Sequence, residues 1–283
     1  MRKITKSIYY ASSYGSVSVG ALVFPEHTLL VDAPLHPENA RAWLADLHQA
    51  GAGSNRTLLY LDSHPDRTLG GQTLQADVIA HEETARQMSR RAAVFKTIRQ
   101  ESGTDWENTP GLTGLRQTMP RLTFSQAAQL QMGGLELHIE LRDGVGPGAC
   151  WLIVPQEQVL FVGDALTLNE PPFLSHADIP TWLEQLEELQ ARPYKDFSII
   201  AGRGGKAEGR DIKQLHTWLK DIHGKLRSAS RGKNTESEIE KLATRYAERY
   251  KPSTKLRTRY IQRLRFGMQE YAARHFAAPR RKK

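Results

Sequence analysis

The sequence predicts a layered α/β fold, and three observations lead to that prediction. Short apolar runs of strand length alternate along the chain with stretches whose apolar residues recur at helical spacing. An alternation of this kind favours an architecture in which helices cover the faces of sheets. The chain has 283 residues, of which 39% are hydrophobic, so it can build a large core. Polar clusters directly follow several apolar runs, which is typical of sheets that place ligands at the ends of their strands.

The first half of the chain is predicted to open with a hairpin and a helix. Two strands are expected at 17–24 and 29–32, joined by a turn that contains Pro25. Residues 37–50 carry apolar side chains at helical spacing, and Gly51 ends that helix. The elements expected next are strands at 57–61 and 74–79, a helix at 82–100 and a long surface loop or lid at 101–119.

The second half is predicted to complete a second set of strands and then to become helical. The expected strands are 135–141, 150–154, 158–162 and 197–201, and the expected helices are 179–191, 213–227, 236–250 and 256–275. No internal repeat of fixed period interrupts this order.

The positive charge of the chain is concentrated at its C-terminal end. The formal net charge is +8, but residues 230–283 alone carry 16 Lys and Arg against 5 Asp and Glu. The preceding part is therefore slightly acidic, and the basic character belongs to the end of the chain. We expect a main domain at 1–229 and a basic helical extension at 230–283.

Cys150 is the only cysteine, so no disulfide can form within the chain. A reducing, cytoplasmic location is therefore expected. Cys150 begins an apolar run and has no cationic neighbour in sequence, which favours a buried small side chain over a nucleophile. No apolar run approaches the roughly 18 residues of a membrane-spanning helix, so no membrane partner is expected.

Three polar clusters follow predicted strands and mark the expected site. Residues 62–67 follow the strand at 57–61, Asp164 follows the strand at 158–162, and Arg203 follows the strand at 197–201. If these strands run in the same direction, the three clusters meet at one edge of the sheets.

Six segments, taken together, resemble the metallo-β-lactamase superfamily in their order and spacing. They are LLVDAP at 29–34, DSHPDRTLGG at 62–71, IAHE at 79–82, GVGPG at 144–148, VLFVGD at 159–164 and IIAGRG at 199–204. The resemblance implies a four-layer αββα sandwich with a metal site at one edge of its two sheets, followed here by C-terminal helices.

The first loop keeps only half of the metal ligands that the resemblance implies. Active members of the superfamily present His-x-His-x-Asp-His in this loop. By position, Asp62 replaces the first histidine, and His64 and Asp66 keep the second histidine and the aspartate. Arg67 stands at the position of the last histidine.

The later segments are altered in the same way. The histidine that precedes the Pro-Gly turn falls at Val145, the bridging aspartate is kept as Asp164, and the final histidine falls at Arg203. One site could still hold a single divalent metal, Zn²⁺ or Mn²⁺, on Asp62, His64 and Asp164. A hydrogen-bonded cluster that holds no metal is the alternative, and the sequence leaves both open.

The second zinc site is predicted to be absent. Its remaining carboxylates, Asp66 and Asp164, face Arg67 and Arg203, and a guanidinium has no lone pair to offer a metal. Buried carboxylates that lose a metal need another positive charge. We therefore expect the two arginines to form ion pairs with Asp66 and Asp164. Whether they only brace the fold or also form an anion pocket is left open.

The first functional hypothesis is a hydrolase of small anionic esters or lactones that works with one metal or none. Asp62 and His64 would hold the ion, and Asp66 would orient or deprotonate the attacking water. Arg67 and Arg203 would stabilise the oxyanion that develops.

The second hypothesis is a binding or regulatory protein that has lost hydrolysis. Its ligand would be a small anion held between Arg67 and Arg203, or its basic C-terminus would bind nucleic acid or an acidic partner. The competing interpretation of that C-terminus is a pair of amphipathic helices that pack on the domain. The sequence gives no indication of the oligomeric state.

Overall fold

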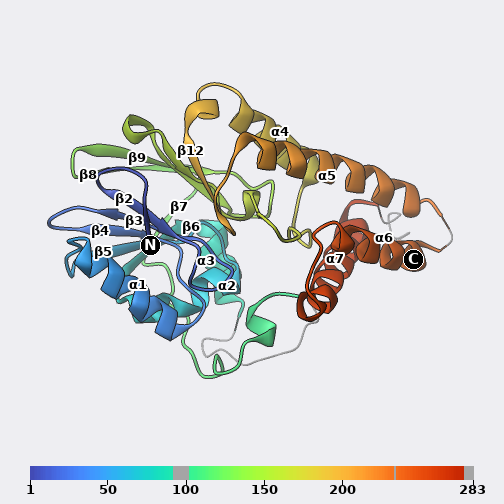
Figure 1. The fold of residues 1–283 in the computed structure, drawn as a ribbon, viewed down its shortest axis with the longest axis horizontal. Helices are drawn as coiled ribbons and strands as arrows, with labels where there is room; N and C mark the ends of the chain where they lie inside the picture. Colours follow the sequence, from blue (N-terminus) through green and yellow to red (C-terminus); the bar gives the residue numbers. More distant parts are fainter. Residues whose placement is uncertain (92–101, 233, 277–283) are drawn as a thin grey trace.

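The computed structural model describes residues 1–91, 102–232 and 234–276, whose strands form two sheets (Figure 1). The seven-stranded sheet has the order β1 (Arg2–Lys3), β2 (Ile8–Ala11), β3 (Val19–Val23), β4 (Thr28–Val31), β5 (Arg56–Leu59), β6 (Asp77–His81) and β7 (Leu122–Phe124). The six-stranded sheet has the order β13 (Gly205–Lys206), β12 (Ser198–Ala201), β11 (Val159–Phe161), β10 (Cys150–Val154), β9 (Leu135–Leu141) and β8 (Ala127–Met132).

The two sheets pack face to face. Successive side chains of β10 point alternately toward the other sheet and toward the helices. All five residues of β10 are buried. Cys150 and Leu152 belong to the cluster between the sheets, together with Leu29 of β4, whereas Trp151 and Ile153 belong to a cluster under the helices. Successive side chains of a strand point to opposite faces, so a strand that is apolar throughout must be covered on both sides.

Helices cover the outer face of each sheet and complete four layers. Helix α1 (Pro37–Gln49) lies on the seven-stranded sheet and buries Trp43 and Leu47 against it. Helices α4 (Ile179–Gln190) and α5 (Gly209–Ala229) cover the other sheet. The αββα sandwich expected from the sequence is therefore present.

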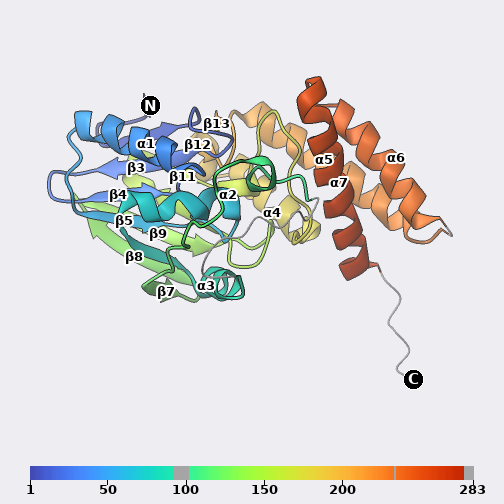
Figure 2. The ribbon, with the colours of Figure 1, turned by 90° about the horizontal axis from the view of Figure 1, so that it is seen from below.

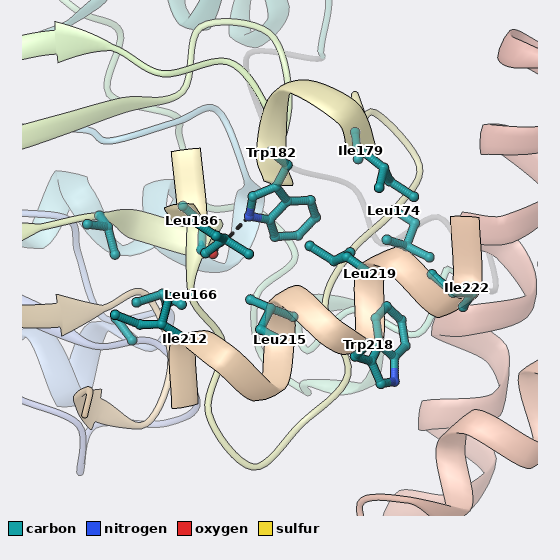
Figure 3. Close-up of a cluster of buried hydrophobic side chains, with 14 of the residues drawn as sticks. Leu166, Leu174, Ile179, Trp182, Leu186, Ile212, Leu215, Trp218, Leu219 and Ile222 are labelled. Carbon is teal, nitrogen blue, oxygen red and sulfur yellow. Dashed lines mark hydrogen bonds between the residues drawn. The ribbon is translucent and has the colours of Figure 1, made fainter. Parts of the chain in front are cut away.

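The helical side of the second sheet has a large apolar core. Figure 3 shows Trp182 and Leu186 of α4 pointing toward Leu215 and Leu219 of α5, all of them buried. The indole Nε1–H of Trp182 donates to the carbonyl of Ala165 at 2.9 Å, so the polar atom of this buried ring is satisfied.

The C-terminal helices α6 (Thr235–Glu248) and α7 (Thr254–His275) pack on one another and on α5 (Figures 1 and 2). Their buried side chains, including Tyr246 and Leu264, belong to the same apolar cluster as those of α4 and α5. These helices pack as amphipathic elements against the rest of the chain. A domain boundary between 229 and 230 stays a prediction.

Most expected strands and helices are found within a few residues of their predicted ends, and the exceptions have local causes. The strand predicted at 74–79 begins at Asp77, because a 3-10 turn occupies Leu69–Leu74 and Gln75 adopts φ 49°. The helix predicted at 82–100 is α3 (Glu82–Ser89), and residues 92–101 lie outside the described part of the chain. Strands β1, β2, β7, β8 and β13 were not predicted.

Candidate functional site

The three polar clusters singled out from the sequence meet at one edge of the sandwich. Strands β4, β5 and β6 run parallel in one sheet, and β11 and β12 run parallel in the other. Asp62 follows β5, Asp164 follows β11 and Arg203 follows β12, and these side chains are joined through the ion pairs described next.

Arg67 lies at the centre of three carboxylates. It belongs to the short helix α2 (Pro65–Thr68), and its side chain is fully buried. Its Nη1 donates to Asp32 at 2.7 Å, its Nε lies 3.1 Å from Asp62 Oδ1, and its Nη2 is paired with Asp164. One guanidinium thus faces the side chains of Asp32, Asp62 and Asp164 together.

Arg203 lies beside Arg67 and is equally buried. Its Nη2 donates to Asp66 at 2.9 Å, its Nη1 to Asp105 at 3.0 Å, and its Nε to Asp164 Oδ1 at 3.3 Å. Gly202 allows this approach, since a Cβ there would lie 2.6 Å from Asp164 Oδ1. Asp164 therefore lies between the two guanidiniums, as expected from the sequence.

The expected partners of the arginines are found in part. Arg203 contacts Asp66 and Asp164 as predicted, whereas Arg67 contacts Asp32 and Asp62 in place of Asp66. The catalytic and metal-binding roles assigned to these residues stay predictions.

The side chain of Asp66 is fully buried, so its carboxylate oxygens are not accessible to water. Besides Arg203, it accepts hydrogen bonds from the backbone N–H groups of Asp105 at 3.2 Å and Trp106 at 2.8 Å. The segment that was predicted to be a long surface loop or a lid is thus tied to the centre of the site at these two residues. Asp66 is held in place by these bonds and does not face the cavity.

His64 begins helix α2, and its ring has a defined orientation. Its Nδ1 accepts a hydrogen bond from the backbone N–H of Asp66 at 3.2 Å, as N-terminal capping residues do. Burial, together with the charge of Arg203, lowers the pKa of His64 well below its usual value. A neutral ring whose Nδ1 accepts must carry its proton on Nε2, so His64 presents an N–H donor at its other nitrogen.

A third arginine, Arg263 of α7, extends the cluster toward the C-terminal helices. It is buried, and its Nη1 donates to Glu170 at 2.6 Å while its Nε donates to the carbonyl of Gly103 at 3.1 Å. Its guanidinium lies 4.1 Å from the ring centre of Phe173, and that of Arg203 lies 4.7 Å from the same ring. Helix α7 is therefore part of this site.

Four residues that contact the arginine cluster were not assigned to the site from the sequence: Asp32, Asp105, Glu170 and Arg263. Asp32 stands in the segment 29–34 that carries part of the resemblance, so its place in that motif was a usable signal. The other three come from irregular segments or from α7, and no local pattern places them beside Arg203.

Carboxylates outnumber guanidiniums in this cluster. The acids are Asp32, Asp62, Asp66, Asp105, Asp164 and Glu170, and the arginines among the described residues are Arg67, Arg203, Arg259 and Arg263. An excess of buried negative charge favours retention of protons by some of the acids.

The acids of this cluster differ in whether burial or the neighbouring arginines dominate their pKa. Burial alone would raise the pKa of Asp164, but Arg67 and Arg203 outweigh it and hold that pKa well below its usual range. Arg67 is the arginine that lowers the pKa of Asp32, whereas Arg67 and Arg203 both act on Asp62. Burial outweighs these charges, raises the pKa of Asp32 to about 7 and also raises the pKa of Asp62. Asp164 is therefore ionised, whereas Asp32 retains a proton below neutral pH.

A cavity of about 460 Å³ opens beside the arginine cluster. Asp62 and His64 contribute to its lining, with 14% and 18% of their side chains exposed. Its described lining residues further include Arg90, Arg91, Trp106, Val145, Pro147, Phe173, Leu174, His176, Arg263 and Phe266. Arg67 and Arg203 are not among its lining residues. The space between these two arginines, where the sequence left an anion pocket open, is occupied by the carboxylate of Asp164.

The residues at the positions of the family's metal ligands do not fit a metal in this arrangement. Asp62 and Asp164 are paired with Arg67, and the Nδ1 of His64 already accepts a backbone hydrogen bond. Within residues 1–91, 102–232 and 234–276, no group of three His, Cys, Asp or Glu side chains is arranged to hold a metal ion. A single metal on Asp62, His64 and Asp164 remains a prediction that requires these ion pairs to open.

The arginines of the C-terminal helices are largely engaged within the protein. Arg249 pairs with Asp221, Arg257 with Glu248, Arg259 with Asp105 and Arg265 with Glu240. Ion-paired side chains are less able to neutralise the phosphates of a nucleic acid.

The described helices are also too short or too polar to cross a membrane.

Comparison with known proteins gives a likeness in structure only. No protein-family model matches the sequence, and no curated protein matches it. A metallo-beta-lactamase family protein from Thermus thermophilus matches with a TM-score of 0.66 and 21% identity, over 96% of this chain and 94% of that one.

Two further solved structures have related folds and different activities in their descriptions. A stereoselective inverting sec-alkylsulfatase from Pseudomonas sp. gives a TM-score of 0.65 at 15% identity, over 96% of this chain but 49% of its own. A metallo-beta-lactamase from Pontibacter korlensis gives a TM-score of 0.57 at 16% identity, over 78% of this chain and 98% of its own. The chain therefore has the metallo-β-lactamase fold.

Proposed function

We propose that the chain is a metal-independent binding protein that holds a small organic ligand in the cavity beside the arginine cluster. One observation carries this proposal: the guanidinium of Arg67 occupies the space among Asp32, Asp62 and Asp164. The protein supplies by itself the positive charge that a metal would bring to these carboxylates.

The groups around the cavity are poorly suited to activate water. Asp66 is buried and fully hydrogen-bonded, and Asp164 is ionised between two guanidiniums, which makes it a weak base. His64 directs an N–H donor away from α2, so it is suited to hold an acceptor atom of a ligand. Binding is therefore better supported than metal-assisted hydrolysis.

Asp62 favours a second candidate, a hydrolase that works without a metal. It lines the cavity, its side chain is 14% exposed, and burial raises its pKa. A carboxylate with a raised pKa beside a cavity is a candidate general base. Small esters or lactones would be the substrates of such an enzyme.

A thermal-shift screen of small organic ligands tests the first candidate. Ligands that raise the melting temperature of the native protein should have no effect on Gly146→Leu. Gly146 lines the cavity, and the nearest atom to a Cβ built there is a side-chain atom of His176 at 3.4 Å, so a larger side chain enters the cavity. Stabilisation that persists in Gly146→Leu, or no stabilising ligand at all, would overturn the proposal.

Activity assays of the native protein with panels of esters, lactones and phosphoesters distinguish the binding protein from the hydrolase. Turnover that survives a chelator and disappears in Asp62→Asn would establish the metal-free hydrolase. Turnover that requires added Zn²⁺ or Mn²⁺ would instead support the single metal on Asp62, His64 and Asp164. The binding proposal expects neither.

A further inference from the structure

We infer that the ligand of this cavity is a hydrophobic monoanion, an apolar body that carries one carboxylate or similar oxyanion. The inference rests on the proposed binding function and names the chemical class that the cavity accepts. It depends on three features of the lining: two arginines on one side that form no ion pair with a described residue, several apolar side chains in the walls, and the N–H donor of His64, which together with Asp62 forms the floor.

The cationic side consists of Arg90 and Arg91, which follow helix α3. Neither arginine forms an ion pair with a described residue, and Arg90 is exposed. Arg91 is partly buried and donates to the carbonyl of Ser63, which holds its guanidinium at the cavity. Arg67, Arg203 and Arg263 differ because acids already neutralise them. Asp62 acts on the charge of Arg91 without forming an ion pair with it. Guanidiniums that no described carboxylate contacts can still bind the carboxylate of a ligand.

Apolar side chains from distant parts of the chain form much of the cavity wall. Val145 and Pro147 belong to the loop before β10, Phe173 and Leu174 to the segment before α4, and Phe266 to α7. Such surfaces favour a ligand with an apolar body over a strongly hydrated ion such as phosphate. A volume of about 460 Å³ is in the range of small-molecule sites.

The floor selects against a second negative charge on the ligand. Asp62 lines this part of the cavity with 14% of its side chain exposed. His64 beside it accepts the backbone N–H of Asp66 at Nδ1, which leaves Nε2 as an N–H donor. A dianion would place its second charge near Asp62, whereas a hydroxyl or carbonyl oxygen can accept from His64 without that repulsion. The anionic group therefore belongs at Arg90 and Arg91 and the uncharged end at the floor.

Three probes test the inference: 2-naphthoate, its neutral analogue 2-naphthamide, and inorganic phosphate. Binding to the full chain is measured by calorimetry and by tryptophan fluorescence, since Trp106 lines the cavity. We expect 2-naphthoate to bind at least about tenfold more tightly than 2-naphthamide, and phosphate not to displace it. Arg90→Gln/Arg91→Gln should remove the preference for the acid and change the affinity for the amide by less than about twofold.

Arg86→Gln is the matched control, because Arg86 belongs to α3, is 53% exposed and is already paired with Glu83. It should leave all three affinities unchanged. Arg90→Gln alone, an exposed substitution, should weaken binding of the acid several-fold if the double variant fails to fold.

The outcomes separate the inference from the proposed function. If 2-naphthoate and 2-naphthamide bind equally and both are blocked by Gly146→Leu, the ligand class is wrong and the binding function stands. If phosphate displaces 2-naphthoate, the site selects charge alone and the inference is wrong. If neither naphthyl probe binds, the inference is wrong, and the broader thermal-shift screen decides the binding function.

Discussion

The guanidinium of Arg203 donates to the carboxylate of Asp66 at 2.9 Å, and neither side chain is exposed to solvent. Removal of one partner from such a pair leaves a buried charge uncompensated, which costs about 3–5 kcal/mol. The stability lost when this pair is broken therefore measures how much the charge of Arg203 contributes to holding this edge of the sandwich together.

Arg203→Met should lower the free energy of unfolding by about 3–5 kcal/mol, because Asp66, Asp105 and Asp164 would lose a shared cation. Chemical denaturation measures the change. Arg121→Met is the control, since Arg121 and its partner Asp77 are 79% and 68% exposed, and its effect should stay within about 0.5 kcal/mol. Equal effects of the two substitutions would contradict the role given to Arg203.

Replacement of both buried arginines by histidine should create a zinc site. Arg67→His/Arg203→His places two imidazoles beside Asp66 and Asp164, which together form a four-ligand set that Zn²⁺ accepts. Zinc should then raise the melting temperature of this variant, by an increment that grows with zinc concentration.

The control for that experiment is Arg67→Gln/Arg203→Gln, which removes the same charges and supplies no imidazole. Its melting temperature should not respond to zinc, and neither should that of the native protein. A zinc response of equal size in the glutamine variant would show that the histidines do not form the site.

The stability of the protein should fall as pH rises from about 4 to 7, in part because of Asp32. Burial raises the pKa of Asp32 to about 7, so the folded chain keeps a proton that the unfolded chain releases near pH 4. The folded state binds more protons in this window, and the free energy of unfolding therefore declines, by at most about 4 kcal/mol.

Chemical denaturation of the native protein and Asp32→Asn at pH 5 and pH 7.5 measures this contribution. Asn cannot titrate, so the variant should lose less stability than the native protein between the two pH values, whatever its absolute stability. Parallel changes in the two proteins would contradict a raised pKa of Asp32.

Arg263 should couple the C-terminal helices to the site. Arg263→Met removes the partner of Glu170 and the cation beside Phe173, so both stability and ligand binding should fall. Arg257→Met, on the same helix but 50% exposed, is the matched control and should change neither. Retention of full ligand affinity in Arg263→Met would show that α7 does not shape the cavity.

The strands and helices with strong apolar patterns could be predicted from the sequence, and those that depend on their partners could not. Strand β10 is apolar throughout, whereas β8 alternates exposed and partly buried residues and pairs with β9 alone among the strands that the structure describes. An edge strand of Ala, Gln, Leu and Met carries little signal of its own, because its partner β9 determines its conformation.

The centre of the site was predicted from the resemblance, and its outer part was not. Asp62, Asp66, Arg67, Asp164 and Arg203 stand at positions of known motifs. Arg263 reaches Gly103 across 160 residues of sequence, and a contact of that kind arises only from the packing of α7. The same long-range contacts determine which acids surround each arginine, so the pairing of Arg67 with Asp32 was not expected.

The proposal that arginine charge stands in for metal ions at this edge of the fold predicts that the native protein does not retain zinc. Mass-spectrometric metal analysis of the purified native protein, before and after incubation with excess zinc and desalting, should find far less than one zinc per chain. One or more zinc ions per chain, lost on Asp62→Ala or Asp164→Ala, would contradict the proposal.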